Sequence, residues 1–241
     1  MVYSRRKEWF DPALVDVFLA EARAGRLWEN LGEPDLARSG SFMEPADRVV
    51  VANSEWLNLI AHAFARITDA KSPFTYRHSE GIARAAAKMT EHMGLPASVV
   101  HDQTRAGLLH DIGKLAVSNR ILDKPGSLTD EEFAKVKQHP RLTYEVLTRV
   151  APFRGIAEVA ASHHERLDGT GYHRGLTAED LSLPSRILAV ADVFDALSQE
   201  RPYRPAMPME TVLAILKNES GQKLSSECVE ALEDLISKGE L

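Results

Sequence analysis

The stretch LLHDIGKL, residues 108–115, places a histidine and an aspartate side by side within an apolar helical pattern, with a lysine three residues after the aspartate. A buried charge is costly unless a partner compensates for it, and a metal ion is one of the few partners that are strong enough. The stretch therefore predicts a metal site to which His110 and Asp111 contribute. The other ligands must come from elsewhere in the chain.

Composition limits the kinds of partner. The 241 residues are 44% hydrophobic and carry a net charge of −6, without a dense basic block, which disfavours a nucleic-acid polymer as a ligand. Cys228 is the only cysteine, so neither an intrachain disulfide nor a cysteine-based metal site is expected. The sequence shows no signal peptide and no apolar run long enough to cross a bilayer. We therefore expect a cytoplasmic protein with no membrane segment.

Helical periodicity dominates, and no segment shows a convincing strand alternation, so the fold class is predicted to be all-α. Asp11 and Pro12 have the form of an N-cap and first helical residue, Gly94 that of a helix-ending glycine, and Thr129 with Glu132 that of a capping box. Further helices are predicted over 53–69, 97–115, 141–150, 154–165, 185–199, 208–218 and 226–238.

The N-terminal part is set apart by a segment rich in turn-forming residues at 33–46. Residues 1–45 are predicted to form a short helical extension, and residues 46–241 the main domain. FDPALVDVF at 10–18 is similar in polarity to LSSECVEAL at 224–232. This similarity is either fortuitous or a sign that residues 1–45 are the tail of a related upstream domain, in which case the chain is a fragment of a longer protein.

Seven histidines and aspartates lie on, or at the ends of, the predicted helices. They are enough to hold two divalent ions if one carboxylate bridges the pair, and the mixture of imidazole and carboxylate suits Fe, Mn, Zn, Co or Ni. His62, His92 and His101 are interpreted instead as ordinary surface or core residues. The candidate ligands are His78, His110, Asp111, His139, His163, His164 and Asp192.

The pair His163–His164 strengthens this prediction. It ends an apolar helix and is followed by a loop that is punctuated by glycines, in ASHHERLDGTGYH. Consecutive helical residues are about 100° apart around the axis, so the two imidazoles can flank one ion but cannot both face one core.

Several motifs now identify a family. YRHSEGIA, LLHDIGKL, ILDKPGSLTDEEF, KQHP, SHHERLDGTGYHRGL and RILAVADVFDALSQERPYR follow one another between about residues 70 and 235. In order and spacing they resemble the HD-GYP family of the HD phosphohydrolase superfamily.

The resemblance implies an HD-type helical bundle with a dinuclear metal centre. Fe or Mn is the preferred expectation for the two ions, and Zn, Co or Ni is the alternative. It implies hydrolysis of the bacterial messenger cyclic di-GMP to the linear dinucleotide pGpG by a water that both metals activate, and it leaves open a further hydrolysis to GMP. By position, His78, His110, Asp111 and Asp192 match the ligands of one metal. Asp111 would bridge to a second metal, whose other ligands would be His139, His163 and His164. Lys114 matches a lysine that faces the scissile phosphate, where it would neutralise developing charge.

Two departures from the family pattern stand out. Gly171-Tyr172-His173 replaces Gly-Tyr-Pro, which adds an imidazole to a loop on the substrate side. Phe74 occupies the position of a glutamate that binds a third metal in some members, so two metals are expected. Arg201 and Arg204 are predicted to contact the substrate, and so is Tyr172, for which simple packing is the alternative.

Other functions stay open at this stage. The same metal chemistry would serve a nucleotidase or a hydrolase of another cyclic dinucleotide. The altered loop would also suit a catalytically weak variant that binds nucleotides or proteins. For each of these functions, a homodimer or a regulatory protein partner stays open. A diiron redox bundle fits less well, because such proteins rely on Glu-x-x-His motifs.

Overall fold

The computed structural model describes residues 11–25, 52–71, 78–199 and 205–241. The chain divides into two compact units, Met1–Val51 and Ala52–Leu241. The predicted turn-rich segment 33–46 and the predicted domain boundary after residue 45 lie outside the described residues. In the described part of the chain, no helix is both long and apolar enough to pass through a bilayer.

The first unit contains helix α1 (Pro12–Arg23). Its N-terminus forms as the sequence predicts: the Asp11 carboxylate accepts hydrogen bonds from the main-chain N–H groups of Ala13 and Leu14, and Pro12 occupies the first turn. These contacts satisfy donors that have no partner within the helix.

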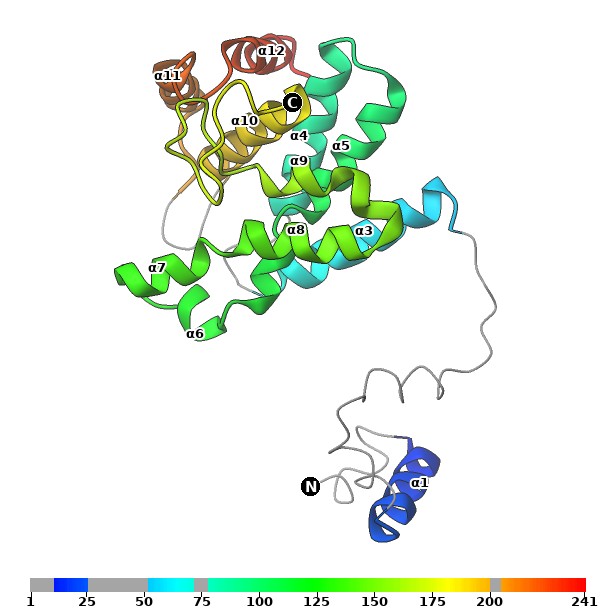
Figure 1. Ribbon diagram of the computed structural model, residues 1–241. Helices are drawn as coiled ribbons and strands as arrows, with labels where there is room; N and C mark the ends of the chain where they lie inside the picture. Colours follow the sequence, from blue (N-terminus) through cyan, green and yellow to red (C-terminus); the bar gives the residue numbers. More distant parts are fainter. Residues whose placement is uncertain (1–10, 26–51, 72–77, 200–204) are drawn as a thin grey trace. The chain divides into compact units, whose positions relative to one another are not determined.

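The second unit is a bundle of helices (Figure 1). Within the described residues there are only two isolated β-bridges and no strand, and the all-α prediction is confirmed. Its elements are α3 (Ser54–Asp69), α4 (His78–His92), α5 (Ala97–Leu109), η2 (Ile112–Ala116), α6 (Asn119–Leu122), α7 (Asp130–Val136), α8 (His139–Arg149), η3 (Ala151–Ile156), α9 (Ala157–Ala161), α10 (Leu183–Ser198), α11 (Met209–Glu219) and α12 (Ser226–Ser237).

Helix α4 lies at the centre of the bundle and packs against α3, α5, α10 and α12. Its alanine-rich sequence lets neighbouring helices approach closely. Opposite Ala83, a Cβ atom added to Gly107 would lie only 2.7 Å from the Ala83 Cα, so α4 and α5 touch almost backbone to backbone. Ile82 and Met89 fill the remaining space and are fully buried. This packing fixes the start of α4 next to the end of α5.

The prediction of one helix over 97–115 is wrong at its C-terminal end. Helix α5 ends at Leu109, and a 3₁₀ helix, η2, begins at Ile112. Asp111 lies between them with φ −99° and ψ 5°, outside the helical region. Gly113 allows η2 to approach the start of α8 closely, because an added Cβ would lie 2.0 Å from the His139 carbonyl oxygen. The turn brings the motif against the start of α8.

The other predicted helices are found with small shifts. The capping box of α7 forms between Thr129 and Glu132, and Gly94 has the positive φ, 74°, of a helix-ending glycine. The helix predicted over 154–165 is shorter: the described chain has η3, then α9, which ends at Ala161. Its early end leaves His163 and His164 in the turn that follows.

Candidate metal centre

Each of three histidines, His110, His139 and His163, lies just after the end of a helix. The last carbonyl groups of a helix have no partner within it. In each histidine, Nδ1 lies close to the carbonyl oxygen three residues earlier, at 2.7 Å for His110, 2.8 Å for His139 and 2.7 Å for His163. A carbonyl only accepts, so Nδ1 must carry the proton. In the neutral imidazole, Nε2 then presents a free lone pair, which is the form that binds metals.

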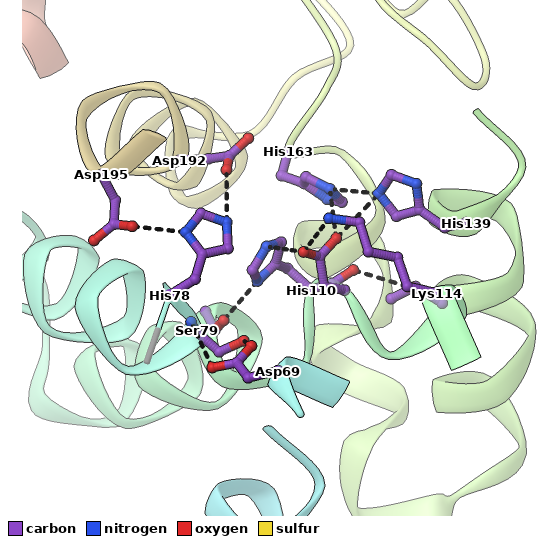
Figure 2. A network of polar contacts seen from close by, with 12 residues as sticks. Asp69, His78, Ser79, His110, Lys114, His139, His163, Asp192 and Asp195 are labelled. Atoms are coloured by element: carbon purple, nitrogen blue, oxygen red, sulfur yellow. Dashed lines mark hydrogen bonds and ion pairs between the residues drawn. The ribbon is translucent and has the colours of Figure 1, made fainter. Parts of the chain in front are cut away.

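The rings of these three histidines lie close together in Figure 2, and their Nε2 atoms converge on the buried Asp111. Asp111 Oδ2 lies 3.1 Å from His110 Nε2, whereas Oδ1 lies 3.1 Å from His139 Nε2 and 3.7 Å from His163 Nε2. The carboxylate therefore has one oxygen toward each of two histidine groups. That is the arrangement expected of a bridging ligand.

The cluster contains more acceptors than donors. His139 Nε2 and His163 Nε2 are 3.1 Å apart, although each Nδ1 already holds its ring proton. The buried atoms His110 Nε2 and Asp111 Oδ1 have no hydrogen bond of acceptable geometry. Lone pairs facing one another in a dry site repel unless a cation or a proton lies between them. The ligand atoms of this cluster are thus suited to binding divalent metal ions.

Helices α4 and α10 add His78 and Asp192 to the group that contains His110. His78 Nε2 lies 3.7 Å from Asp192 Oδ1, and His164 Nδ1 lies 3.4 Å from Asp192 Oδ2. All seven residues singled out in the sequence come together, and their roles as ligands stay a prediction. Three sets have ligand atoms within 4.8 Å of one another: His139, His163 and His164; His78, His110 and Asp192; and His110, Asp111 and His163.

Burial and charge oppose each other in this centre. Burial disfavours the ionised form of Asp111, but His110 and Lys114 outweigh it and hold the pKa of that carboxyl well below its usual range. Burial also lowers the pKa of His110, yet the Asp111 charge prevails and raises that pKa to about 9. Burial dominates at His164, whose pKa falls to about 3. A cation that binds beside His110 must therefore displace a proton.

Lys114 lies at the edge of the cluster. Its Nζ is 2.5 Å from Asp111 Oδ2, and its side chain is 21% exposed. The 3₁₀ turn brings the two residues together, because its side chains at i and i+3 eclipse. The ammonium group is thus held beside the buried carboxylate while keeping access to solvent.

Asp195 is a functional candidate that sequence reasoning missed. Its Oδ2 lies 2.6 Å from His78 Nδ1, and this fixes the ring so that Nε2 points toward Asp192 (Figure 2). Gly81 leaves the space, since an added Cβ would lie 2.1 Å from Asp195 Oδ1. A carboxylate behind a metal-binding histidine commonly orients that histidine. The i, i+3 spacing of Asp192 and Asp195 was the signal available in the sequence.

Replacement of Asp195 by asparagine should weaken metal binding by roughly 10–100-fold, because His78 loses the charge that orients its ring. The measurement is a metal titration followed by counting of bound ions per chain. Asp234→Asn is the matched control, because Asp234 pairs with His92 3.5 Å away in a histidine–aspartate contact elsewhere on the bundle. Equal metal affinity in the two variants would contradict the role of Asp195.

Two further contacts support the ligands without any sequence signal. The Thr143 hydroxyl donates to the His110 carbonyl oxygen at 2.8 Å and accepts from the Gly113 N–H at 3.1 Å, which attaches α8 to the motif. Asp69 accepts from the Ser79 hydroxyl and N–H at 2.7 and 3.2 Å, which holds the start of α4. The first contact joins residues 33 positions apart, and the second joins the end of α3 to the start of α4.

The predicted substrate contacts are only partly described. The Tyr172 ring lies 4.7 Å from the His164 ring, next to the cluster. Burial, followed by the charges of Asp192 and Asp111, raises the pKa of Tyr172 well above its usual value, so its hydroxyl stays protonated. Arg201, Arg204 and Phe74 lie outside the described residues.

Fold and site together define an all-α protein with a centre of histidines and aspartates that is suited to divalent metals. The sequence matches the HD domain family over residues 62–227, and the chain belongs to this family. Its resemblance to HD-GYP proteins is likewise confirmed by the relatives it matches.

Two curated relatives illustrate this. A 3'3'-cGAMP-specific phosphodiesterase 3 of Vibrio cholerae is 40% identical over 236 residues, which are 98% of this chain and 51% of the relative. The cyclic di-GMP phosphodiesterase response regulator RpfG of Xanthomonas campestris is 41% identical over 207 residues, which are 85% of this chain and 53% of the relative. The chain thus spans about half the length of these relatives.

Solved structures agree on the fold. The crystal structure of a cyclic GMP-AMP specific phosphodiesterase of V. cholerae matches with a TM-score of 0.53 and 36% identity, over 98% of this chain and 54% of that one. An HDG"Y"P protein of Bdellovibrio bacteriovorus matches with a TM-score of 0.58 over 77% of this chain and 65% of that one. At 17% identity, the second match supports the fold alone.

Proposed function

We propose that the chain is a metal-dependent phosphodiesterase that hydrolyses a cyclic dinucleotide, with cyclic di-GMP as substrate and the linear dinucleotide pGpG as product. The observation that carries the proposal is the Asp111 carboxylate, whose two oxygens face separate groups of histidines. Relatives named as cyclic di-GMP and 3'3'-cGAMP phosphodiesterases support the same class of substrate.

The side chains have distinct tasks in this reaction. Divalent cations held by the seven ligands would supply Lewis acidity and lower the pKa of a water molecule. Asp111 would hold the two ligand groups at a fixed spacing. Lys114, beside Asp111 Oδ2 and open to solvent, would meet a phosphate oxygen and neutralise the charge that grows on it. Hydrolysis joins the water oxygen to phosphorus and breaks the bond from phosphorus to the 3' oxygen, which leaves with a proton.

A second substrate, 3'3'-cGAMP, is favoured by one observation. The V. cholerae 3'3'-cGAMP-specific relative is 40% identical over 98% of this chain. Because the metal ligands act on the phosphodiester that both molecules share, the choice between the two depends on the walls that contact the bases.

A product assay tests the proposal. The purified protein, reconstituted separately with Fe(II) and Mn(II), is incubated with cyclic di-GMP or with 3'3'-cGAMP. Products are resolved by chromatography, and metals per chain are counted on the same samples. We expect pGpG from cyclic di-GMP with close to two metals per chain. A linear product from 3'3'-cGAMP alone would favour the second substrate, and tight nucleotide binding without product would favour a binding module.

A further inference from the structure

The residue after the histidine pair is a buried carboxylate that the proposed reaction leaves without a task. Glu165 is 1% exposed. Its Oε1 accepts a hydrogen bond from the Arg174 main-chain N–H at 2.8 Å, and its Oε2 accepts one from the Leu176 N–H at 3.0 Å. Both oxygens thus bind main-chain donors of the loop that contains Gly171-Tyr172-His173. Hydrogen bonds to a charged acceptor are among the stronger ones in proteins.

The same loop also contacts the main chain beside Glu165. A Cβ atom added to Gly171 would lie 2.4 Å from the Glu165 Cα, so the loop crosses this backbone at a distance that only glycine allows. One residue on, the Tyr172 N–H donates to the His164 carbonyl oxygen at 3.2 Å. The loop is therefore attached on both sides of the crossing, by main-chain contact at 171–172 and by the carboxylate at 174–176.

These attachments determine where the Tyr172 ring lies. It packs against His164, with ring centroids 4.7 Å apart and planes tilted by 40°. His164 in turn lies against His139, at 5.1 Å between centroids. Tyr172 therefore forms a wall directly beside the candidate metal ligands, at a position set by the path of the loop.

We propose that Glu165 is a positioning residue that holds Tyr172 as a wall of the nucleotide site and so sets the affinity for substrate without contributing to metal binding. The inference rests on the proposed function for the nature of the substrate. If the loop were released, the wall would have to order again each time a nucleotide binds. The apparent affinity would fall with the fraction of molecules in which the wall is in place.

Glu165→Gln is the sharpest test, because the variant keeps the size and shape of the side chain. A glutamine has one accepting oxygen and one NH₂ group, so it can satisfy only one of the two loop N–H groups and turns a donor toward the other. The base of the loop stays closed, since the Ala178 N–H donates to the Leu167 carbonyl oxygen at 3.0 Å. The variant should therefore fold, with the change confined to the loop.

Glu158→Gln is the matched control. The Glu158 carboxylate pairs with the Arg174 guanidinium group at the surface, at 2.5 Å, and its loss leaves both main-chain hydrogen bonds of Glu165 in place. It removes one negative charge near the same loop, as Glu165→Gln does. A difference between the two variants thus reports on the hydrogen bonds rather than on charge.

Three quantities are measured on wild type and both variants: metals per chain, hydrogen exchange at the Arg174 and Leu176 amides, and KM and kcat on the cyclic dinucleotide that wild type hydrolyses. For Glu165→Gln we expect faster exchange, a KM raised about tenfold, little change in kcat and an unchanged metal count. The Glu158→Gln variant should match wild type in all three.

Two results would overturn the proposal: unchanged exchange with unchanged KM in Glu165→Gln, or loss of bound metal in that variant. A wild-type protein that hydrolyses no cyclic dinucleotide would instead refute the proposed function. Amide exchange and metal counts need no substrate, so in that case unchanged exchange would still overturn the positioning role, and faster exchange with a full metal count would support it.

Discussion

An Asp111→Ala protein is expected to lose turnover and bound metal together. The Asp111 carboxylate lies between the two histidine groups, with one oxygen near His110 and the other near His139. Its removal takes away a ligand of both proposed ions and the negative charge that offsets theirs. It also leaves several Nε2 lone pairs facing an emptied space. We expect a loss of catalysis to the background rate and a metal count well below one per chain.

The measurement pairs metal analysis with the product assay on the same preparation, and circular dichroism checks that the bundle stays folded. Asp102→Ala is the control: its side chain is 57% exposed, and it pairs at 3.5 Å with Arg105, a buried residue that also donates hydrogen bonds to Asn58 and Ser54. Because Arg105 keeps those hydrogen bonds when Asp102 is truncated, this variant should stay folded and keep both metal and rate. An Asp111→Ala protein that is active and binds two metals would rule out the bridging role.

The helices could be predicted because their signals are local. The cap at Asp11, the capping box at Thr129 and the helix-ending Gly94 all depend on neighbours within a few residues. The end of α5 could not be predicted in this way. The turn at Asp111 depends on Thr143 and on the His139 carbonyl oxygen, which arrive from a helix some thirty residues away.

The candidate ligands were visible in the sequence, whereas their supports were not. A His-Asp pair and a His-His pair at helix ends have few uses other than metal binding, so the residue types themselves carried information. Asp195 and Glu165 look like ordinary acidic residues until the fold brings His78 to one and the loop amides to the other. Which groups a buried carboxylate contacts is decided by tertiary packing.

Lys114→Ala should differ from Asp111→Ala in its metal content. It should keep its metals and still lose most of its rate. Lys114 offers an ammonium group, which is not a metal ligand, and its removal leaves all seven candidate ligands in place. We expect kcat to fall by about 10²–10³-fold, the loss typical of removing one group that stabilises transition-state charge. Single-turnover rates and metal counts on the same sample measure both effects.

Lys124→Ala serves as the control for Lys114→Ala, because Lys124 forms a comparable contact with Glu132, at 2.6 Å, elsewhere on the bundle. It should have wild-type kcat. Lys114→Arg refines the result: it keeps the charge but replaces a compact ammonium by a broad planar group, so only partial activity should return. Loss of metal from Lys114→Ala would mean that the lysine supports the structure of the centre by holding Asp111. Intact metals with a low rate would mean that its charge acts on the substrate, because the 2.5 Å contact with Asp111 would then be dispensable for metal binding.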